Sequence, residues 1–107
     1  HEAYHAHIYF DVETVATAKL IYAQITDQFD VQLGRLHEKP VGPHTKGMFQ
    51  VAFMSSDFNE IVPWLEAHRK SLAILIHALS GDDLQDHTKH AYWLGGRVEL
   101  DLSIFTK

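Results

Sequence analysis

The sequence predicts an α+β sandwich, in which two helices cover one face of an antiparallel sheet. Two stretches repeat apolar residues at three- and four-residue steps, which is typical of amphipathic helices, and they alternate with short runs rich in β-branched and aromatic residues. The resulting order is β-α-β-β-α-β, as in the ferredoxin-like fold. No repeat or linker interrupts this order, and 107 residues are close to the commonest domain size. We therefore expect residues 1–107 to form one domain.

The first strand is predicted at residues 5–10, because side chains of two kinds alternate there. This alternation places His5, His7 and Tyr9 on one face of the strand. Asp11 can then cap the helix that follows. The helix is indicated by an apolar stripe, which consists of Val15, Ala18, Tyr22, Ile25 and Phe29.

The middle of the chain predicts two further strands, at residues 31–37 and 48–54, and a second helix. Asp57 and Glu60 resemble a capping box at the start of this helix. Its apolar stripe consists of Phe58, Ile61, Val62 and Leu65. A fourth strand follows at residues 72–77 and is apolar up to its last residue, which is typical of a central strand.

The remaining residues predict a polar and aromatic loop at 80–96 and a closing strand at 98–102. In the ferredoxin-like topology the first and fourth strands are neighbours. If the bulky apolar residues face the helices, the opposite face of the sheet carries His5, His7, Tyr9, Gln50, Leu75 and His77. Arg35 joins this face if its strand has the same phase. Such an open face requires a cover, which a partner subunit, the 80–96 loop or a ligand could provide.

The composition excludes several classes of site and partner. The chain has nine histidines and no cysteine, so any metal must be held by His, Asp or Glu side chains. A net charge of -5, with nine Lys and Arg residues that form no runs, argues against nucleic acid and anionic membranes as partners. No apolar run is long enough to cross a bilayer, and no signal-like start is visible. The lack of cysteine agrees with a reducing compartment, and we predict a cytoplasmic protein.

The histidines are the candidate functional residues. Side chains two residues apart on one face of a strand are about 6.5–7 Å apart, so His5 and His7 can reach one metal, although two surface histidines would have the same spacing. His77 is a third candidate ligand, or a core histidine satisfied by hydrogen bonds. His44 ends a stiff loop, Lys39-Pro40-Val41-Gly42-Pro43-His44, which could hold a ligand or simply connect two strands.

Several motifs follow one another in a fixed order along nearly the whole chain. They are His5-Ala6-His7-Ile8-Tyr9-Phe10, Lys39-Pro40-Val41-Gly42-Pro43-His44, Met48-Phe49, Leu75-Ile76-His77, Asp86-His87-Thr88 and Trp93-Leu94-Gly95. This set resembles the DOPA 4,5-dioxygenase family of small extradiol enzymes, and the Pro-Val-Gly-Pro-His motif is its most specific part. The family often has an acidic residue at the position of Gln50.

The resemblance implies a ferredoxin-like subunit that forms a homodimer and opens the ring of a catechol, such as L-DOPA, next to its two hydroxyls. The reaction would use O₂ and non-haem Fe(II), a metal that nitrogen ligands can hold with open positions on one side. The implied metal ligands are His7, His44 and His77. The implied proton-transferring or substrate-orienting residues are His5 and His87. Substrate contacts are predicted for Arg35, Gln50 and Trp93. A carboxylate from Glu99 or Asp101 could complete the site, so a three-histidine set and a two-histidine-one-carboxylate set both stay open.

Two other functions are compatible with a histidine-lined sheet face. One is a binding module for a metal or a small molecule, without turnover, that uses this face as a dimer interface. The other is a cofactor-free oxygenase or isomerase of the dimeric α+β barrel type, in which histidines act only as acids and bases. The first predicts binding without O₂ consumption, and the second predicts activity that survives a chelator.

Overall fold

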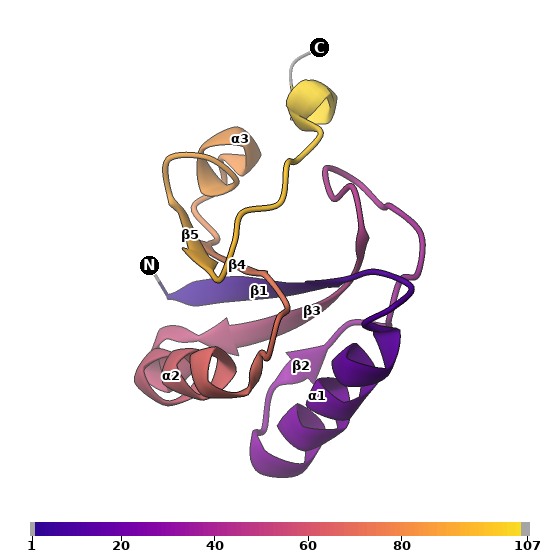
Figure 1. The fold of residues 1–107 in the computed structure, drawn as a ribbon. Coiled ribbons are helices and arrows are strands. Elements are labelled where there is room, and N and C mark those ends of the chain that lie inside the picture. Colours follow the sequence, from indigo (N-terminus) through magenta and orange to yellow (C-terminus); the bar gives the residue numbers. More distant parts are fainter. Residues whose placement is uncertain (1, 106–107) are drawn as a thin grey trace.

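The computed structural model describes residues 2–105 as a sheet with two helices on one side and the C-terminal part of the chain on the other (Figure 1). Its longer elements, in chain order, are β1 (Ala3–Phe10), α1 (Val15–Gln28), β2 (Gln32–Leu33), β3 (Gly47–Met54), α2 (Phe58–His68), β4 (Ile74–Ala78), α3 (Asp83–Asp86) and β5 (Ala91–Leu94). Short 3₁₀ helices lie at Ser55–Asp57 and Leu102–Phe105.

The sheet confirms the predicted fold class. In the part of the chain that is described, its strand order is β2-β3-β1-β4-β5, and neighbouring strands are antiparallel. The first four strands have the ferredoxin-like order, with β1 between β3 and β4. Strand β1 places His5 opposite His77 of β4 and His7 opposite Gln50 of β3. The predicted contact between the first and fourth strands therefore brings together histidines from distant segments.

The main core lies between the sheet and helices α1 and α2. Because every second side chain of a strand points to the same face, β1 contributes Ala6, Ile8 and Phe10 to this core. The other strands and the two helices add Ala18, Ile21, Ile25, Phe49, Val51, Phe53, Ile61, Val62, Leu65, Ile74 and Ile76. The predicted orientation of the sheet is thus confirmed, and the histidines of β1 face away from the helices.

The C-terminal part of the chain covers part of the opposite face. A second apolar cluster forms there around Tyr9, Met48 and Leu75, against which Ala91, Trp93, Val98 and Leu100 pack. Two hydrogen bonds fasten this segment to the loop before β3. The Thr45 hydroxyl donates to the Glu99 carbonyl at 2.5 Å, and the Asp101 amide donates to the Pro43 carbonyl at 2.7 Å.

The predicted closing strand at 98–102 is wrong. The edge of β4 is taken by β5 instead, inside the segment predicted to be a loop, with Ile74 opposite Leu94. Residues 97–101 have no regular secondary structure and lie across the sheet face. The alternating apolar side chains of this segment therefore pack on the face of the sheet, and its backbone does not pair with an edge strand.

The second strand is shorter than predicted, and the capping box is absent. Regular pairing of β2 stops after Leu33, and His37 returns to the sheet as an isolated bridge to Met48. From Leu33 to His37 the chain takes four steps while β3 takes three, from Val51 to Met48, which is the pattern of a β-bulge. At the start of α2, the Asp57 side chain makes no capping hydrogen bond.

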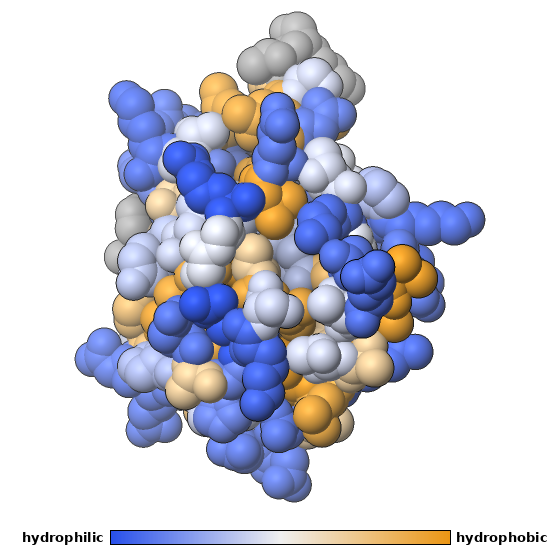
Figure 2. Space-filling view, viewed as in Figure 1, coloured by the Kyte–Doolittle hydropathy of each residue, from blue (hydrophilic) through white to orange (hydrophobic). Residues whose placement is uncertain are grey.

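Polar side chains cover most of the face seen in Figure 2, where apolar side chains show only as small separate patches. Of the helices within residues 2–105, none combines the length and the apolar character that crossing a membrane requires.

Candidate functional site

Five histidines gather on the sheet face that turns away from α1 and α2. We call them the histidine cluster. Its members are His5 and His7 from β1, His77 from β4, His44 from the loop before β3, and His87 from the turn after α3. The first three are brought together by strand register, whereas the last two depend on how the loops pack.

His7 lies at the centre of the histidine cluster. Its Nε2 atom is 3.0 Å from Nε2 of His77, and its ring centroid is 4.3 Å from that of His44. Within residues 2–105, two groups of three histidines have ligand atoms that all lie within 4.8 Å of one another, namely His5, His7 and His77, and His7, His44 and His87. His7 belongs to both groups, whereas the predicted ligands His44 and His77 belong to different ones.

Three members of the cluster are almost completely buried. The exposed fraction is 3% for His7, 5% for His44 and 3% for His77. Burial, followed by repulsion from neighbouring imidazoles, lowers the pKa of His7 well below the ordinary 6.5 and the pKa of His44 and His77 to about 4. Burial also lowers the pKa of His5. These four rings are therefore neutral at pH 7, which is the form that binds a metal.

Backbone carbonyls orient two of the rings. Nδ1 of His77 donates to the Ala78 carbonyl at 2.9 Å, and Nδ1 of His87 donates to the Asp83 carbonyl at 2.7 Å. Because a carbonyl oxygen can only accept, Nδ1 carries the proton in both rings, and the neutral form of either ring would have its lone pair on Nε2. A partner on the far nitrogen is the usual device that orients a histidine ligand.

Tyr9 is a site residue to which sequence reasoning gave no role. Its hydroxyl lies 2.7 Å from Nδ1 of His44, and burial raises the pKa of Tyr9, so the phenol stays protonated. The signal was present, since Tyr9 continues the alternation of His5 and His7 on the same face. Nδ1 of His7, by contrast, is buried and has no hydrogen-bond partner among the described residues.

The stiff loop before β3 holds His44 through a tight turn. The Val41 amide donates to the His44 carbonyl at 3.2 Å, and the His44 amide donates to the Val41 carbonyl at 3.0 Å. Gly42 has a φ of 58°, a left-handed conformation that glycine adopts without a steric cost. The turn, with Pro43 inside it and Pro40 just before it, therefore fixes the backbone from which the His44 ring extends.

A buried carboxylate, Asp86, holds the turn that carries His87. Asp86 is 2% exposed and accepts hydrogen bonds from the amide of Ser80 at 3.0 Å and from its hydroxyl at 2.5 Å. Burial raises the pKa of Asp86, but the hydrogen bonds from Ser80, together with His90 and His77, more than offset this and keep the pKa below its ordinary value. The charged carboxylate thus ties the turn to the end of β4.

A cavity of about 710 Å³ opens beside the cluster. The residues that line it are His87, Thr88, Lys89, Trp93, Arg97, Val98, Glu99, Leu100 and Leu102. The Trp93 ring stacks on Tyr9 at a centroid distance of 5.9 Å, so one aromatic wall connects the cavity to the interior. His87 belongs both to the cluster and to the cavity wall.

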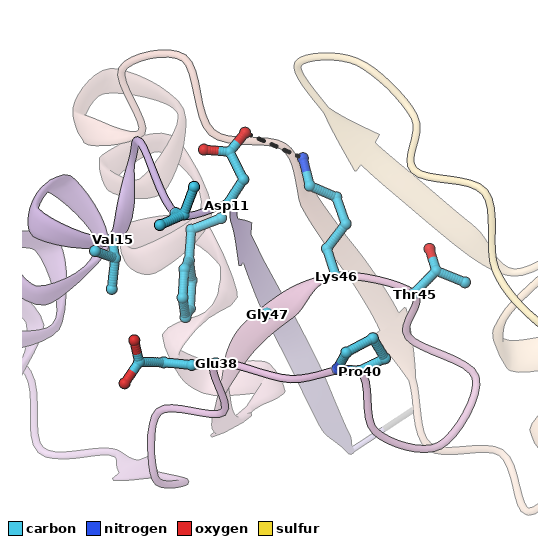
Figure 3. Close-up of a pocket in the computed structure, with 9 residues that line it drawn as sticks. Asp11, Val15, Glu38, Pro40, Thr45, Lys46 and Gly47 are labelled. Carbon is cyan, nitrogen blue, oxygen red and sulfur yellow. Dashed lines mark ion pairs between the residues drawn. The ribbon is translucent and has the colours of Figure 1, made fainter.

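A separate cavity of about 350 Å³ lies where β1 ends (Figure 3). There the Lys46 ammonium approaches the Asp11 carboxylate at 3.9 Å, with Glu38 and Pro40 on the opposite side. Its lining contains no member of the histidine cluster. This cavity is therefore separate from the histidine cluster.

Of the three predicted substrate contacts, Trp93 and Gln50 lie near the cavity or the histidine cluster, and Arg35 does not line the cavity. Trp93 lines the large cavity, and Gln50 lies opposite His7 in the register of β1 and β3. Arg35 is exposed beyond β2 and is not among the residues that line this cavity. Glu99 lines the cavity, and the Asp101 carboxylate accepts hydrogen bonds from Ser103. Neither residue belongs to the two compact histidine groups.

Comparison with known proteins assigns this fold and its histidine cluster to a class, the dioxygenase-like proteins. A solved structure of a protein from Nostoc punctiforme, provisionally named a dioxygenase, superposes with a TM-score of 0.93 at 42% identity and covers 95% of this chain and 89% of its own. The model of the Dopa 4,5-dioxygenase family matches residues 4–104, so the chain belongs to this family.

Two curated relatives are similar over nearly the whole chain. A DOPA 4,5-dioxygenase from Amanita muscaria is 31% identical over 94% of this chain and 48% of its own length. An uncharacterized 21.2 kDa protein from Botryotinia fuckeliana is 32% identical over 95% of this chain and 62% of its own. The chain thus spans about half to three fifths of the length of these relatives.

Proposed function

We propose that the protein is an extradiol ring-cleaving dioxygenase that acts on a catechol, such as L-DOPA, with O₂ and non-haem Fe(II). The observation that carries this proposal is the histidine cluster, in which buried neutral imidazoles surround His7 beside a cavity with an aromatic wall. Membership of the family supports it. The volume of the cavity lies in the range of small-molecule sites.

The donor set fits Fe(II). Imidazole nitrogens suit iron, and the chain has no thiolate that would favour a softer metal. Two nitrogens bound at right angles, with bonds of about 2.1 Å, are about 3 Å apart. The Nε2 atoms of His7 and His77 share a hydrogen bond at 3.0 Å, and the same separation would suit two neighbouring ligands once a metal replaces that proton.

We propose His7, His44 and His77 as the ligands, because these are the buried members of the cluster. His87 is the alternative third ligand, since it completes a compact group with His7 and His44 and its Nδ1 is already engaged by the Asp83 carbonyl, which leaves Nε2 for a metal. A three-nitrogen set is favoured over one with a carboxylate, because Glu99 and Asp101 lie outside the histidine groups.

Bound Fe(II) would let electron density pass from a chelating catecholate to O₂. The chain supplies the groups that orient the ring and move protons. His5 is neutral and can accept a phenolic proton, and His87 reaches from the cluster into the cavity, where it can hold or return one. Trp93 offers a flat apolar wall for an aromatic ring, and Gln50 and Arg35 remain the other proposed substrate contacts.

The test is O₂ uptake after anaerobically Fe(II)-loaded protein is mixed with L-DOPA and with simpler catechols. We expect uptake equal to the catechol consumed, a yellow ring-opened product, and loss of both with a chelator. Catechol binding without uptake would identify a binding module instead. Uptake that survives the chelator would identify a cofactor-free oxygenase.

Metal stoichiometry assigns the ligands. We expect His7→Ala and His44→Ala to abolish Fe(II) binding, and His77→Ala to do so if His77 is the third ligand. Retention of iron by His77→Ala together with its loss in His87→Ala would transfer this role to His87.

We also propose a homodimer and a cytoplasmic location. Sedimentation of the purified protein would measure the first, and fractionation of cells that produce it would measure the second. A monomer at micromolar concentration would contradict the homodimer.

A further inference from the structure

The large cavity offers more room than one aromatic ring needs. It measures about 710 Å³, and part of its wall is formed by Arg97, Val98 and Glu99, which follow β5. A catechol ring placed against Trp93 and His87 would leave space for a substituent. The chemistry of the rest of the wall therefore selects among substituted catechols.

Part of the cavity wall is charged. Lys89, Arg97 and Glu99 all line the cavity, which gives two formal positive charges and one negative. The whole chain, by contrast, has a net charge of -5. No ion pair within residues 2–105 involves Lys89 or Arg97, so both cations are available to a ligand.

The position of Arg97 is held by the chain on both sides. Before it, β5 pairs with β4 up to Leu94, and Gly95 turns the chain with a φ of 75°. After it, the Glu99 carbonyl accepts the 2.5 Å hydrogen bond from Thr45. A guanidinium on a fastened segment loses less entropy when it binds a carboxylate than one on a mobile loop.

We propose that Arg97, assisted by Lys89, is the specificity-determining residue that binds an anionic substituent of the substrate, so that the cavity favours catechols with a side-chain carboxylate over uncharged catechols of the same size. This inference rests on the proposed function. A planar guanidinium can hold both oxygens of a carboxylate at once, and Lys89 adds a second positive charge. Arg35, for which the sequence predicted a substrate contact, is not among the residues that line this cavity.

The test compares 3,4-dihydroxyphenylacetate with its amide, which has nearly the same shape and no charge. Binding of each to the Fe(II)-loaded protein is measured anaerobically by calorimetry, so turnover does not enter. We expect the acid to bind about tenfold more tightly than the amide, as for one charge-assisted hydrogen-bonded pair at a partly open site. This preference should shrink at high salt.

Three variants, each of which removes one positive charge, identify the residue that binds the carboxylate of the acid. Arg97→Gln should reduce the preference for the acid to about twofold or less, and Lys89→Gln should reduce it partly. Lys19→Gln, on the exposed side of α1, is the matched control and should keep the preference of the unmodified protein.

The outcomes separate this inference from the proposed function. Equal binding of acid and amide, or a preference that survives Arg97→Gln and is lost in Arg35→Gln, would overturn the inference and leave the proposed function intact. Failure of both catechols to bind the Fe(II)-loaded protein would overturn the two together.

Discussion

Removal of the Tyr9 hydroxyl group tests whether its contact with His44 supports the proposed metal site. In Tyr9→Phe, Nδ1 of His44 loses its partner at 2.7 Å, in an environment where Tyr9 is 1% exposed and His44 is 5% exposed. A buried polar atom without its partner costs about 1–3 kcal/mol, and partners of histidine ligands contribute about 10- to 100-fold to metal affinity. We therefore expect the dissociation constant for Fe(II) to rise about tenfold or more.

The assay is a competition titration of Fe(II) against a chelator of known affinity under anaerobic conditions. Tyr4→Phe is the matched control, because Tyr4 lies on the same strand and faces the main core, where it packs against Phe53 and Phe58. We expect this control to keep the metal affinity of the unmodified protein. An affinity of Tyr9→Phe within twofold of that control would refute the argument that Tyr9 positions His44.

Two further predictions concern stability. Burial lowers the pKa of His44 and His77 to about 4, so between pH 6.5 and 4 the unfolded chain binds protons that the metal-free folded protein does not. The urea midpoint of unfolding should therefore fall as the pH decreases from 6.5 to 4. A constant midpoint would contradict a buried, neutral histidine cluster. In Gly47→Ala the new Cβ would lie 2.8 Å from the Phe10 ring and 2.9 Å from the His37 carbonyl oxygen. This clash should lower the free energy of unfolding by about 1–3 kcal/mol. Gly96→Ala, with open space around the position, should change the urea midpoint little, and equal effects of the two substitutions would contradict this packing.

The part of the fold that strand periodicity controls could be predicted from the sequence. The alternation at residues 5–10 placed His5, His7 and Tyr9 on the face away from the helices, and the ferredoxin-like order made β1 and β4 neighbours. Together these two inferences predict that His77 meets the histidines of β1. They need only the two-residue period of a strand and a topology in which split βαβ units interleave.

The remaining features depend on tertiary contacts that local patterns do not report. The alternation of Val98, Leu100 and Leu102 predicted an edge strand, but β5 already pairs with that edge, and Val98 and Leu100 pack across the face instead. The separation of His44 and His77 into two compact groups follows from where the loops of His44 and His87 pack, and residue spacing contains no information about that.

The central claim is the insertion of O₂ into a catechol ring at the histidine cluster. We would incubate Fe(II)-loaded protein with a catechol under ¹⁸O₂, reduce the product with borohydride before its aldehyde oxygen exchanges with water, and measure the mass. We expect two ¹⁸O atoms in the ring-opened product, one on each carbon of the cleaved bond, and no such product with His7→Ala. A product with one ¹⁸O atom, or conversion of the catechol to a quinone with the ring intact, would contradict it.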